Sequence, residues 1–401
     1  MLVRAARLVA GFAASIVTAR ALGPAGRGDY FFVVALSAIV VQFAHLGLAS
    51  SNTYLVARRP RLLGPLVVNS AWVALVLGGG MALIAVQALS LGGWFGVPPH
   101  LLMFAIGLAP VSLFYLLGIN LLIGAGRIVA FNVIETSANV LVLIAIVAAA
   151  VTLPTTAAVL GASVVGWSVA SLLLLRLLTR SSPVHPRFDH DAFGAGVQYA
   201  ARAYVVTLLG LLVLRASVFI VQRVAGSTAL GEFSIATQLA EVIGILPAST
   251  ALVLFPRLVR DPSESWLLAV RTCGITGLIL TGACGIVAFV ADPLVRLAYG
   301  PTFTGSVAQL QLLLPGVVCL GMLSVLSQFV AAVGMPLSIV WAWLMGLLSV
   351  VLLCAWLVPI AGGAGAAIAL SVTYLALLIM AFAVGFAHRD TSALQMHELA
   401  R

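Results

Sequence analysis

Residues 20–30 read RALGPAGRGDY, and residues 223–233 read RVAGSTALGEF. At a spacing of 203 residues the two stretches pair Arg20 with Arg223, Gly23 with Gly226, Gly28 with Gly231, Asp29 with Glu232 and Tyr30 with Phe233. Two further matches follow in the same order, Pro110 with Pro315 at a spacing of 205 and Gly161-Ala162 with Gly365-Ala366 at a spacing of 204. Matches in order at a nearly constant spacing indicate that one unit of the chain has been duplicated.

The composition predicts that this duplicated chain lies in a membrane. Of its 401 residues, 63% are apolar and only 8% are charged, and the mean hydropathy is +1.20. A soluble domain carries about 25% charged residues, because its surface must face water. A chain with so few charges requires lipid as its solvent, so we predict an all-α integral membrane protein.

Twelve segments are long and apolar enough to be transmembrane helices, which need about 20 mainly apolar residues. They run near 3–22, 30–56, 64–92, 99–124, 129–153, 156–179, 196–222, 230–256, 265–291, 305–333, 336–358 and 363–387. Clusters of glycine, proline and arginine, such as GPAGRG at 23–28, separate them. The first segment ends without a small-residue cleavage site, so we expect a retained helix rather than a signal peptide.

The duplication divides these twelve helices into two six-helix lobes. The longest polar connection falls near the midpoint of the chain, so we predict lobes at 1–180 and 196–388, a cytoplasmic linker at 181–195 and a cytoplasmic tail at 389–401. An even number of helices per lobe gives both copies the same orientation, which predicts a pseudo-two-fold axis along the membrane normal. Transporters with such repeats bind substrate between the lobes, so the pattern favours transport.

The basic residues predict the topology. All 20 are arginines, and with both termini in the cytoplasm fourteen of them lie on the cytoplasmic side and four on the outer side, while Arg202 and Arg215 lie within a helix. Retained cytoplasmic segments collect positive charge, so this asymmetry predicts that both termini are cytoplasmic. The arginines form no basic arm or stripe, and we expect no nucleic-acid partner.

Nothing in the sequence predicts a cofactor or a metal site. The phosphate-binding motif GxxxxGK[ST] requires a lysine, which this chain lacks, so we do not expect ATP hydrolysis. The four cysteines stand apart within apolar runs, as is typical of packing residues. The stretch HPRFDHD at 185–191 contains metal-ligand residue types, but it lies in a polar loop with two prolines, and we interpret it as a solvated linker.

Charged residues inside predicted membrane helices are candidate functional residues, because burying them in lipid is costly. Arg215 and Glu241 lie at similar depth on adjacent helices, where they either form a structural ion pair or meet the substrate. Arg202 either extends to the cytoplasmic interface or faces a cavity, and Glu135, at similar depth, is a candidate partner for it. His45 lies among apolar residues, and we interpret it as a hydrogen-bonded core residue.

The matched ends of the repeat carry two further pairs of charges. Arg20 and its mate Arg223 fall at the outer ends of predicted helices, and Asp29 and Glu232 fall at the starts of the helices that follow. Each charge complements a helix dipole there, contacts the substrate, or does both.

Three prolines fall in the middle of predicted helices, namely Pro110, Pro247 and Pro315. Each frees a backbone carbonyl and permits a kink. Such kinks suit hinges in a wall around a cavity, although inert kinks fit the sequence equally well.

Four longer stretches carry a family resemblance. They read ARALGPAGRGDYFFV at 19–33, LGEFSIATQLAEVIGILPASTALVLFPRL at 230–258, LVRLAYGPTFTGSVAQLQLLLPG at 294–316 and LVPIAGGAGAAIALSVTYL at 357–375. In order and spacing they resemble segments of the bacterial polysaccharide exporters and O-antigen flippases, which share a superfamily with multidrug exporters and lipid II flippases. Twelve helices favour the polysaccharide branch over the lipid II flippases, which have fourteen.

The resemblance implies a flippase of the bacterial inner membrane that moves an undecaprenyl-diphosphate-linked oligosaccharide to the outer leaflet by alternating access. Its implied partners are this lipid-linked oligosaccharide, membrane lipid and a coupling ion, H+ or Na+. In the related lipid II flippases, a basic residue at the position of Arg20 and an acidic one at that of Asp29 matter for function. An arginine fork binds two phosphate oxygens. We therefore expect substrate contacts from Arg20, Asp29, Arg202, Arg215 and Arg223, and coupling or ion pairing from Glu135 and Glu241.

Two other functions are open at this point. An ion-coupled drug or metabolite antiporter of the same fold would also use a membrane carboxylate such as Glu135 or Glu241. A membrane enzyme that modifies glycans would carry its catalytic residues in a long outer loop or in a histidine motif. The outer loops here are short, so we expect no enzymatic activity.

Overall fold

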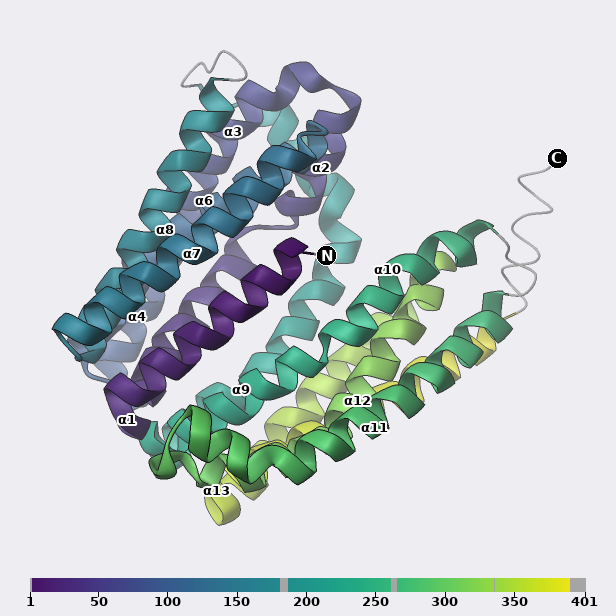
Figure 1. The fold of residues 1–401 in the computed structure, drawn as a ribbon. Coiled ribbons are helices and arrows are strands. Elements are labelled where there is room, and N and C mark those ends of the chain that lie inside the picture. Colours follow the sequence, from purple (N-terminus) through teal and green to yellow (C-terminus); the bar gives the residue numbers. More distant parts are fainter. Residues whose placement is uncertain (1, 181–186, 261–264, 335, 390–401) are drawn as a thin grey trace. The chain divides into compact units, whose positions relative to one another are not determined.

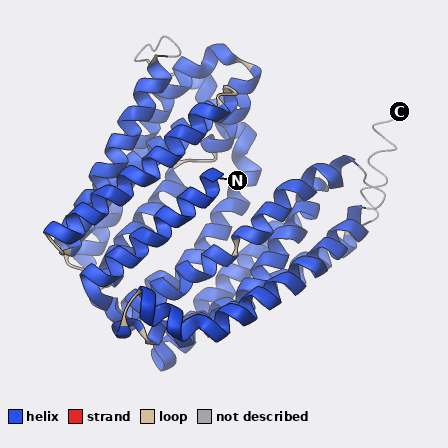
Figure 2. Cartoon of the chain, viewed as in Figure 1, coloured by secondary structure: helices blue, strands red, loops and turns tan. Residues whose placement is uncertain are grey.

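The computed structural model describes residues 2–180, 187–260, 265–334 and 336–389, and it gives the backbone alone for residues 2–6, 202, 203 and 252. Every regular element in this part of the chain is a helix (Figures 1 and 2). The prediction of an all-α protein is therefore confirmed.

The helices gather in two compact units, and all three boundaries between the units fall in the longest helix, α9 (His190–Ile243). The first unit holds Met1–Leu211 and Gly226–Gly231, and the second holds Leu212–Ala225 and Glu232–Arg401. The short segment Gly226–Gly231 thus packs with the first unit, although the residues on both sides of it belong to the second.

The first unit is organised around one central helix, α6. Besides the start of α9, its elements are α1 (Leu2–Ala44), α2 (Leu48–Arg58), η1 (Pro60–Leu62), α3 (Leu63–Trp72), η2 (Val73–Gly79), α4 (Gly80–Gly92), α5 (Pro99–Leu102), α6 (Phe104–Gly124), α7 (Ile128–Thr152) and α8 (Thr156–Thr179). Helix α6 packs against α1, α2 and α8, and Leu113, Leu117 and Leu121 are fully buried in these contacts.

The second unit is organised in the same way around α12. Besides the rest of α9, its elements are α10 (Ile245–Arg260), α11 (Ser265–Ala298), η3 (Pro301–Phe303), α12 (Gly305–Ala332) and α13 (Leu337–Ala387). Helix α12 packs against α10, α11 and α13, and Leu310, Val325 and Phe329 are fully buried there.

The two central helices are the ones that carry the matched prolines, Pro110 in α6 and Pro315 in α12. Half of the most apolar part of each helix is buried inside the protein, whereas the other membrane-length helices of the described chain reach at most 39%. Equivalent positions of the sequence repeat therefore occupy equivalent places in their units.

Nine helical stretches among the described residues are long and apolar enough to cross a membrane. Three of them are 38, 57 and 51 residues long, and each contains one glycine with non-helical backbone angles, at Gly23, Gly226 and Gly362. The predicted loop at 23–28 is therefore wrong in its extent. Only Gly23 leaves the helix, because Pro24 suits the first turn of the helix that follows.

The predicted helix at 30–56 is also divided, because α1 ends at Ala44 and α2 begins at Leu48. Between them Leu46 and Gly47 take positive φ angles of 48° and 78°. His45 is buried at this turn, and its Nδ1 accepts a hydrogen bond of 2.9 Å from the backbone N–H of Gly47. It is thus hydrogen-bonded, as expected of a core histidine.

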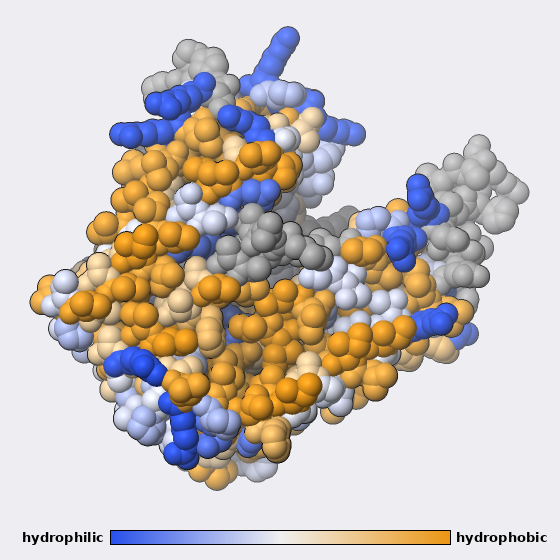
Figure 3. Space-filling view, in the orientation of Figure 1, coloured by the Kyte–Doolittle hydropathy of each residue, from blue (hydrophilic) through white to orange (hydrophobic). Residues whose placement is uncertain are grey.

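Large apolar side chains cover much of the outer surface. Phe289 is 88% exposed and Leu91 is 85% exposed, and many other leucines, valines and isoleucines lie open in the same way. Figure 3 shows apolar side chains along the helices and hydrophilic ones gathered near helix ends. Water would penalise such a surface, whereas the hydrocarbon of a bilayer accommodates it.

Candidate functional site

The matched glycines of the repeat form two closely similar bends. Gly23 has φ 66° and ψ −178°, and Gly226 has φ 80° and ψ 179°. This backbone conformation is almost closed to residues with a Cβ atom, so glycine is required at both positions. The repeat recognised in the sequence thus places the same turn at both sites.

Just after the bends the two matched segments cross each other within the first unit. A Cβ atom built on Gly28 would collide with the backbone carbonyl of Ser227, and one on Gly231 would collide with the carbonyl of Pro24. Gly28 and Gly231 are repeat mates, and so are Pro24 and Ser227. The contact is therefore reciprocal, as a local two-fold axis would produce, and we call it the glycine crossing.

The acidic residues that follow the bends have different partners. Asp29 accepts a hydrogen bond from the hydroxyl of Ser227 at the glycine crossing. Its mate Glu232 accepts from the backbone N–H of Gly305, at the start of α12, and from Nε2 of Gln309 at 3.3 Å. Neither contact lies on the acid's own helix, so both carboxylates join separate segments of the chain.

The arginines near the first bend lie in contrasting environments. Arg20 is exposed and stands three residues before the bend, as does its mate Arg223 before the second bend. Arg27 is only 3% exposed, and it donates to the hydroxyls of Thr18 and Ser15 across the bend. Arg27 is one of the four arginines that the sequence places on the outer side, and no site role was predicted for it. Its repeat mate is Leu230, and this loss of charge between the copies was the signal that could have singled Arg27 out.

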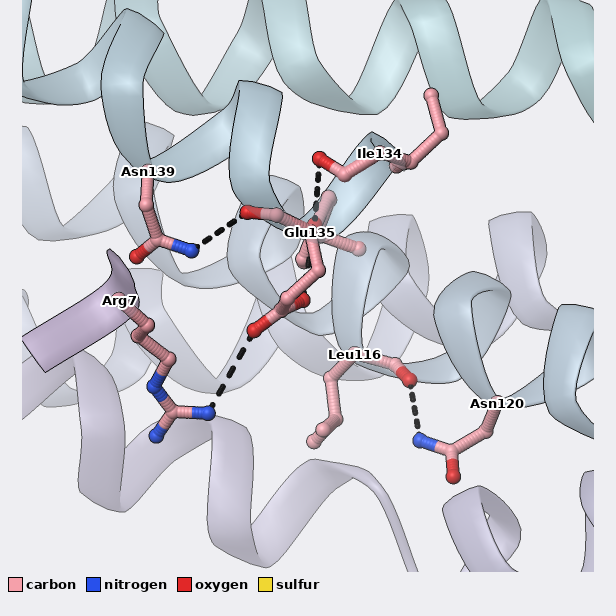
Figure 4. A network of polar contacts seen from close by, with 7 residues as sticks. Arg7, Leu116, Asn120, Ile134, Glu135 and Asn139 are labelled. Carbon is pink, nitrogen blue, oxygen red and sulfur yellow. Dashed lines mark hydrogen bonds and ion pairs between the residues drawn. The ribbon is translucent and has the colours of Figure 1, made fainter. Parts of the chain in front are cut away.

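Glu135 is the centre of a polar network inside the first unit, which Figure 4 shows in close-up. One carboxylate oxygen lies 3.5 Å from the guanidinium of Arg7, and the other accepts a 3.1 Å hydrogen bond from the hydroxyl of Tyr115. Asn139 donates to the backbone carbonyl of Glu135, one turn away on α7. The predicted partner, Arg202, lies where the structure describes no side chain, so that pairing stays a prediction, and the contact with Arg7 was missed.

The second unit holds the pair that the sequence suggested. Nη2 of Arg215 lies 3.3 Å from Oε1 of Glu241. The Arg215 side chain is 23% exposed and that of Glu241 is 57% exposed. Glu241 is therefore the more open member of the pair.

The stretch 185–191 divides into two parts, and its first two residues lie outside the described chain. Asp189 caps α9 by accepting from the backbone N–H of Ala192, and it exchanges two hydrogen bonds with the side chain of Asn69. The end of this linker is therefore anchored rather than solvated. Among the residues that the structure describes, no three His, Cys, Asp or Glu side chains gather in a cluster that could hold a metal ion.

The three prolines differ in their effect on the helices. Helices α6 and α12 continue through Pro110 and Pro315, whereas the chain leaves the helix at Gly244, three residues before Pro247. A membrane helix can absorb the missing hydrogen bond of a proline when the freed carbonyl finds another partner. The role of these prolines as hinges stays a prediction.

Residues 1–260 match the model of a family described as polysaccharide biosynthesis protein. The chain belongs to this family. The match confirms the resemblance drawn from the four sequence stretches. A comparison with curated proteins gives no match.

Solved structures show which fold this member of the polysaccharide biosynthesis family has. It is similar to the lipid II flippase MurJ in an inward closed conformation, with a TM-score of 0.77, 14% identity and coverage of 98% of this chain and 91% of that one. It is also similar to an inward-facing multidrug resistance MATE family transporter of the MOP superfamily, with a TM-score of 0.73, 16% identity and coverage of 96% and 95%.

A third match is a MOP superfamily transporter from Pyrococcus furiosus, with a TM-score of 0.69, 16% identity and coverage of 98% and 94%. At such low identity these likenesses show the fold alone. The family member described here therefore has the fold of the MOP transporters. Together with its apolar helices, this makes it a multi-pass membrane protein.

Proposed function

We propose that this protein is a flippase that moves an undecaprenyl-diphosphate-linked oligosaccharide from the inner to the outer leaflet of the bacterial inner membrane by alternating access. The observation that carries the proposal is the match of residues 1–260 to the polysaccharide biosynthesis family. Polysaccharide building blocks are assembled on a lipid carrier and must cross the bilayer, which a chain with the MOP transporter fold is suited to perform.

The proposal includes twelve membrane crossings in two lobes, 1–180 and 196–388. At 1.5 Å per residue, straight helices of 38, 57 and 51 residues would be about 57, 86 and 77 Å long. All three lengths far exceed a hydrocarbon thickness of about 30 Å, so each long stretch is expected to turn back across the membrane. The glycine bends provide these turns. If each bend divides one long stretch into two membrane crossings, the nine stretches give twelve crossings. The sequence repeat, with an even number of helices in each lobe, supports the proposed two-fold axis along the membrane normal.

In this proposal the arginines hold the diphosphate, because a guanidinium binds two phosphate oxygens at once. Arg215 is the principal candidate, with Arg20, Arg202 and Arg223 along the path and Asp29 positioning the crossing. The carboxylates of Glu135 and Glu241 pair with arginines and are candidates for coupling to H+ or Na+. Pro110, Pro247 and Pro315 would permit bending during the change of access.

Depletion of the protein in its own bacterium tests the function. We expect the surface glycan to disappear while its lipid-linked precursor accumulates at the inner leaflet, because synthesis continues after export stops. Lipid extraction and mass spectrometry measure the precursor, and a plasmid copy of the gene is the control. Unchanged levels of both glycan and precursor would refute the proposal.

The proposed orientation, with both termini in the cytoplasm, predicts a labelling pattern. In a variant without the four cysteines, a single cysteine at Thr302 should react with an impermeant maleimide added to intact cells, and one at Thr179 should react only after lysis. Both positions are exposed, so access is decided by the side of the membrane. Labelling of Thr179→Cys in intact cells would contradict the proposed orientation, because it would place Thr179 on the outer side of the membrane.

The similarity to a multidrug transporter favours a second candidate function, that of an ion-coupled antiporter. An ion-coupled antiporter would export small organic cations and make cells resistant to them. A flippase for lipid-linked sugars would leave that resistance unchanged. Growth of depleted and complemented cells on a series of cationic dyes separates the two functions.

A further inference from the structure

A groove on the first unit lies between the start of α7 and the end of α8, apart from the residues proposed to carry substrate. Its volume is about 800 Å³. Three arginines line it, Arg127 before the first turn of α7 and Arg176 and Arg180 one turn apart at the end of α8. The groove therefore gathers three positive charges within one small region of the surface.

The remainder of the groove is mainly apolar. Its walls include Val129, Val133, Leu173 and Leu177. Val129 is 78% exposed, Val133 is 58% exposed and Leu173 is 39% exposed, so these side chains present an open apolar surface. A single ligand that fits this lining has a negatively charged head group and a hydrocarbon tail.

The position of the groove along the helices matches the depth of a lipid head group. The three arginines stand at helix ends, where a membrane helix meets water. Val133 and Leu173 lie about one to two turns further into the helices, whereas Val129 and Leu177 lie level with the arginines. The start of α7 adds the positive end of its helix dipole beside Arg127. Basic pockets between membrane helices at the cytoplasmic face recognise anionic lipid head groups in this way.

We propose that this groove binds an anionic phospholipid, with its phosphates on the three arginines and its acyl chains along α7 and α8. The proposal is independent of the transported substrate, although its assignment to the cytoplasmic leaflet rests on the proposed orientation. A phospholipid is the favoured occupant because it is present in the leaflet at bulk concentration, so even a site of moderate affinity is filled.

Native mass spectrometry of the purified full chain tests this site. Cardiolipin and phosphatidylcholine are titrated in detergent, and the retained lipid is counted. We expect wild type to retain cardiolipin in preference to phosphatidylcholine. The triple variant Arg127→Gln, Arg176→Gln, Arg180→Gln should bind cardiolipin about 100-fold more weakly, since each arginine near an anionic head group contributes about a factor of five.

Two further variants make the test specific. Arg58→Gln, Arg59→Gln, Arg61→Gln removes the same charge from exposed arginines outside the groove and should retain cardiolipin as wild type does. Val133→Trp fills the groove, keeps every charge and should lose cardiolipin. Equal loss in both triple variants, or full retention by Val133→Trp, would overturn the proposal. Displacement of cardiolipin by an equimolar amount of a polyprenyl diphosphate would also overturn it, because the groove would then be a substrate site.

Discussion

Replacing Arg215 with alanine is expected to reduce translocation of the lipid-linked oligosaccharide about 100-fold, which corresponds to the loss of a two-pronged, charge-assisted contact with phosphate. The amount of folded protein should stay the same if Arg215 serves the substrate rather than the fold. A lower amount of protein would instead indicate that Arg215 and Glu241 form a structural pair. Both expectations are checked by measuring the amount of surface glycan and the amount of folded protein in the same cells.

The double variant Arg215→Ala, Glu241→Ala separates substrate binding from simple ion pairing. If Arg215 holds the diphosphate, the double variant stays inactive, and Arg215→Lys recovers part of the activity because the charge remains and the fork is lost. Arg296→Ala is a matched control, since it breaks an exposed arginine–aspartate pair on α11 and should transport normally. Wild-type transport by the double variant would show that the pair is only structural.

Substituting alanine for Gly28 is expected to open the glycine crossing and to lower the free energy of unfolding by about 1–3 kcal/mol, the usual effect of overpacking. The added methyl group would meet the backbone carbonyl of Ser227, which cannot rotate away as a flexible side chain could. The hydrogen bond from Ser227 to Asp29 should be lost with the crossing. Thermal unfolding of the purified protein measures the effect.

Gly11 supplies the control for this experiment. It lies on the same helix, α1, and a Cβ atom there would meet nothing within 4 Å, so Gly11→Ala should leave stability unchanged or raise it slightly. Gly231→Ala should destabilise as much as Gly28→Ala, because the contact is reciprocal. An unfolding temperature for Gly28→Ala equal to that of Gly11→Ala would contradict the described crossing.

Apolar composition and length predicted most of the helical stretches, because lipid requires long, uninterrupted apolar runs. The segment predicted at 156–179 coincides with α8 (Thr156–Thr179). The errors fall at the boundaries and bends between helices. A cluster such as GPAGRG looks like a loop, yet one glycine in an unusual conformation is enough to redirect the chain while its neighbours stay helical.

A contact between two charged residues of the candidate site was predictable only where both residues lie at equal depth in the membrane on neighbouring helices. Arg215 and Glu241 fit this case, since adjacent antiparallel helices bring equal depths together. The contact of Asp29 with Ser227 spans 198 residues, and it depends on the packing of two helix starts. The contact of Arg7 with Glu135 likewise depends on how α1 packs against α7, which no local pattern specifies.

The proposed flippase activity can be measured as translocation in purified vesicles. The full chain is reconstituted into liposomes that contain an undecaprenyl-diphosphate oligosaccharide in both leaflets, with H+ or Na+ gradients imposed in separate runs. A glycosidase that cannot enter the vesicles digests the outer pool. We expect the inner pool to become digestible in vesicles with wild-type protein, and to stay protected in empty vesicles and in those with Arg215→Ala. An inner pool that stays protected beside wild-type protein, in vesicles that export a small organic cation, would contradict the proposed activity.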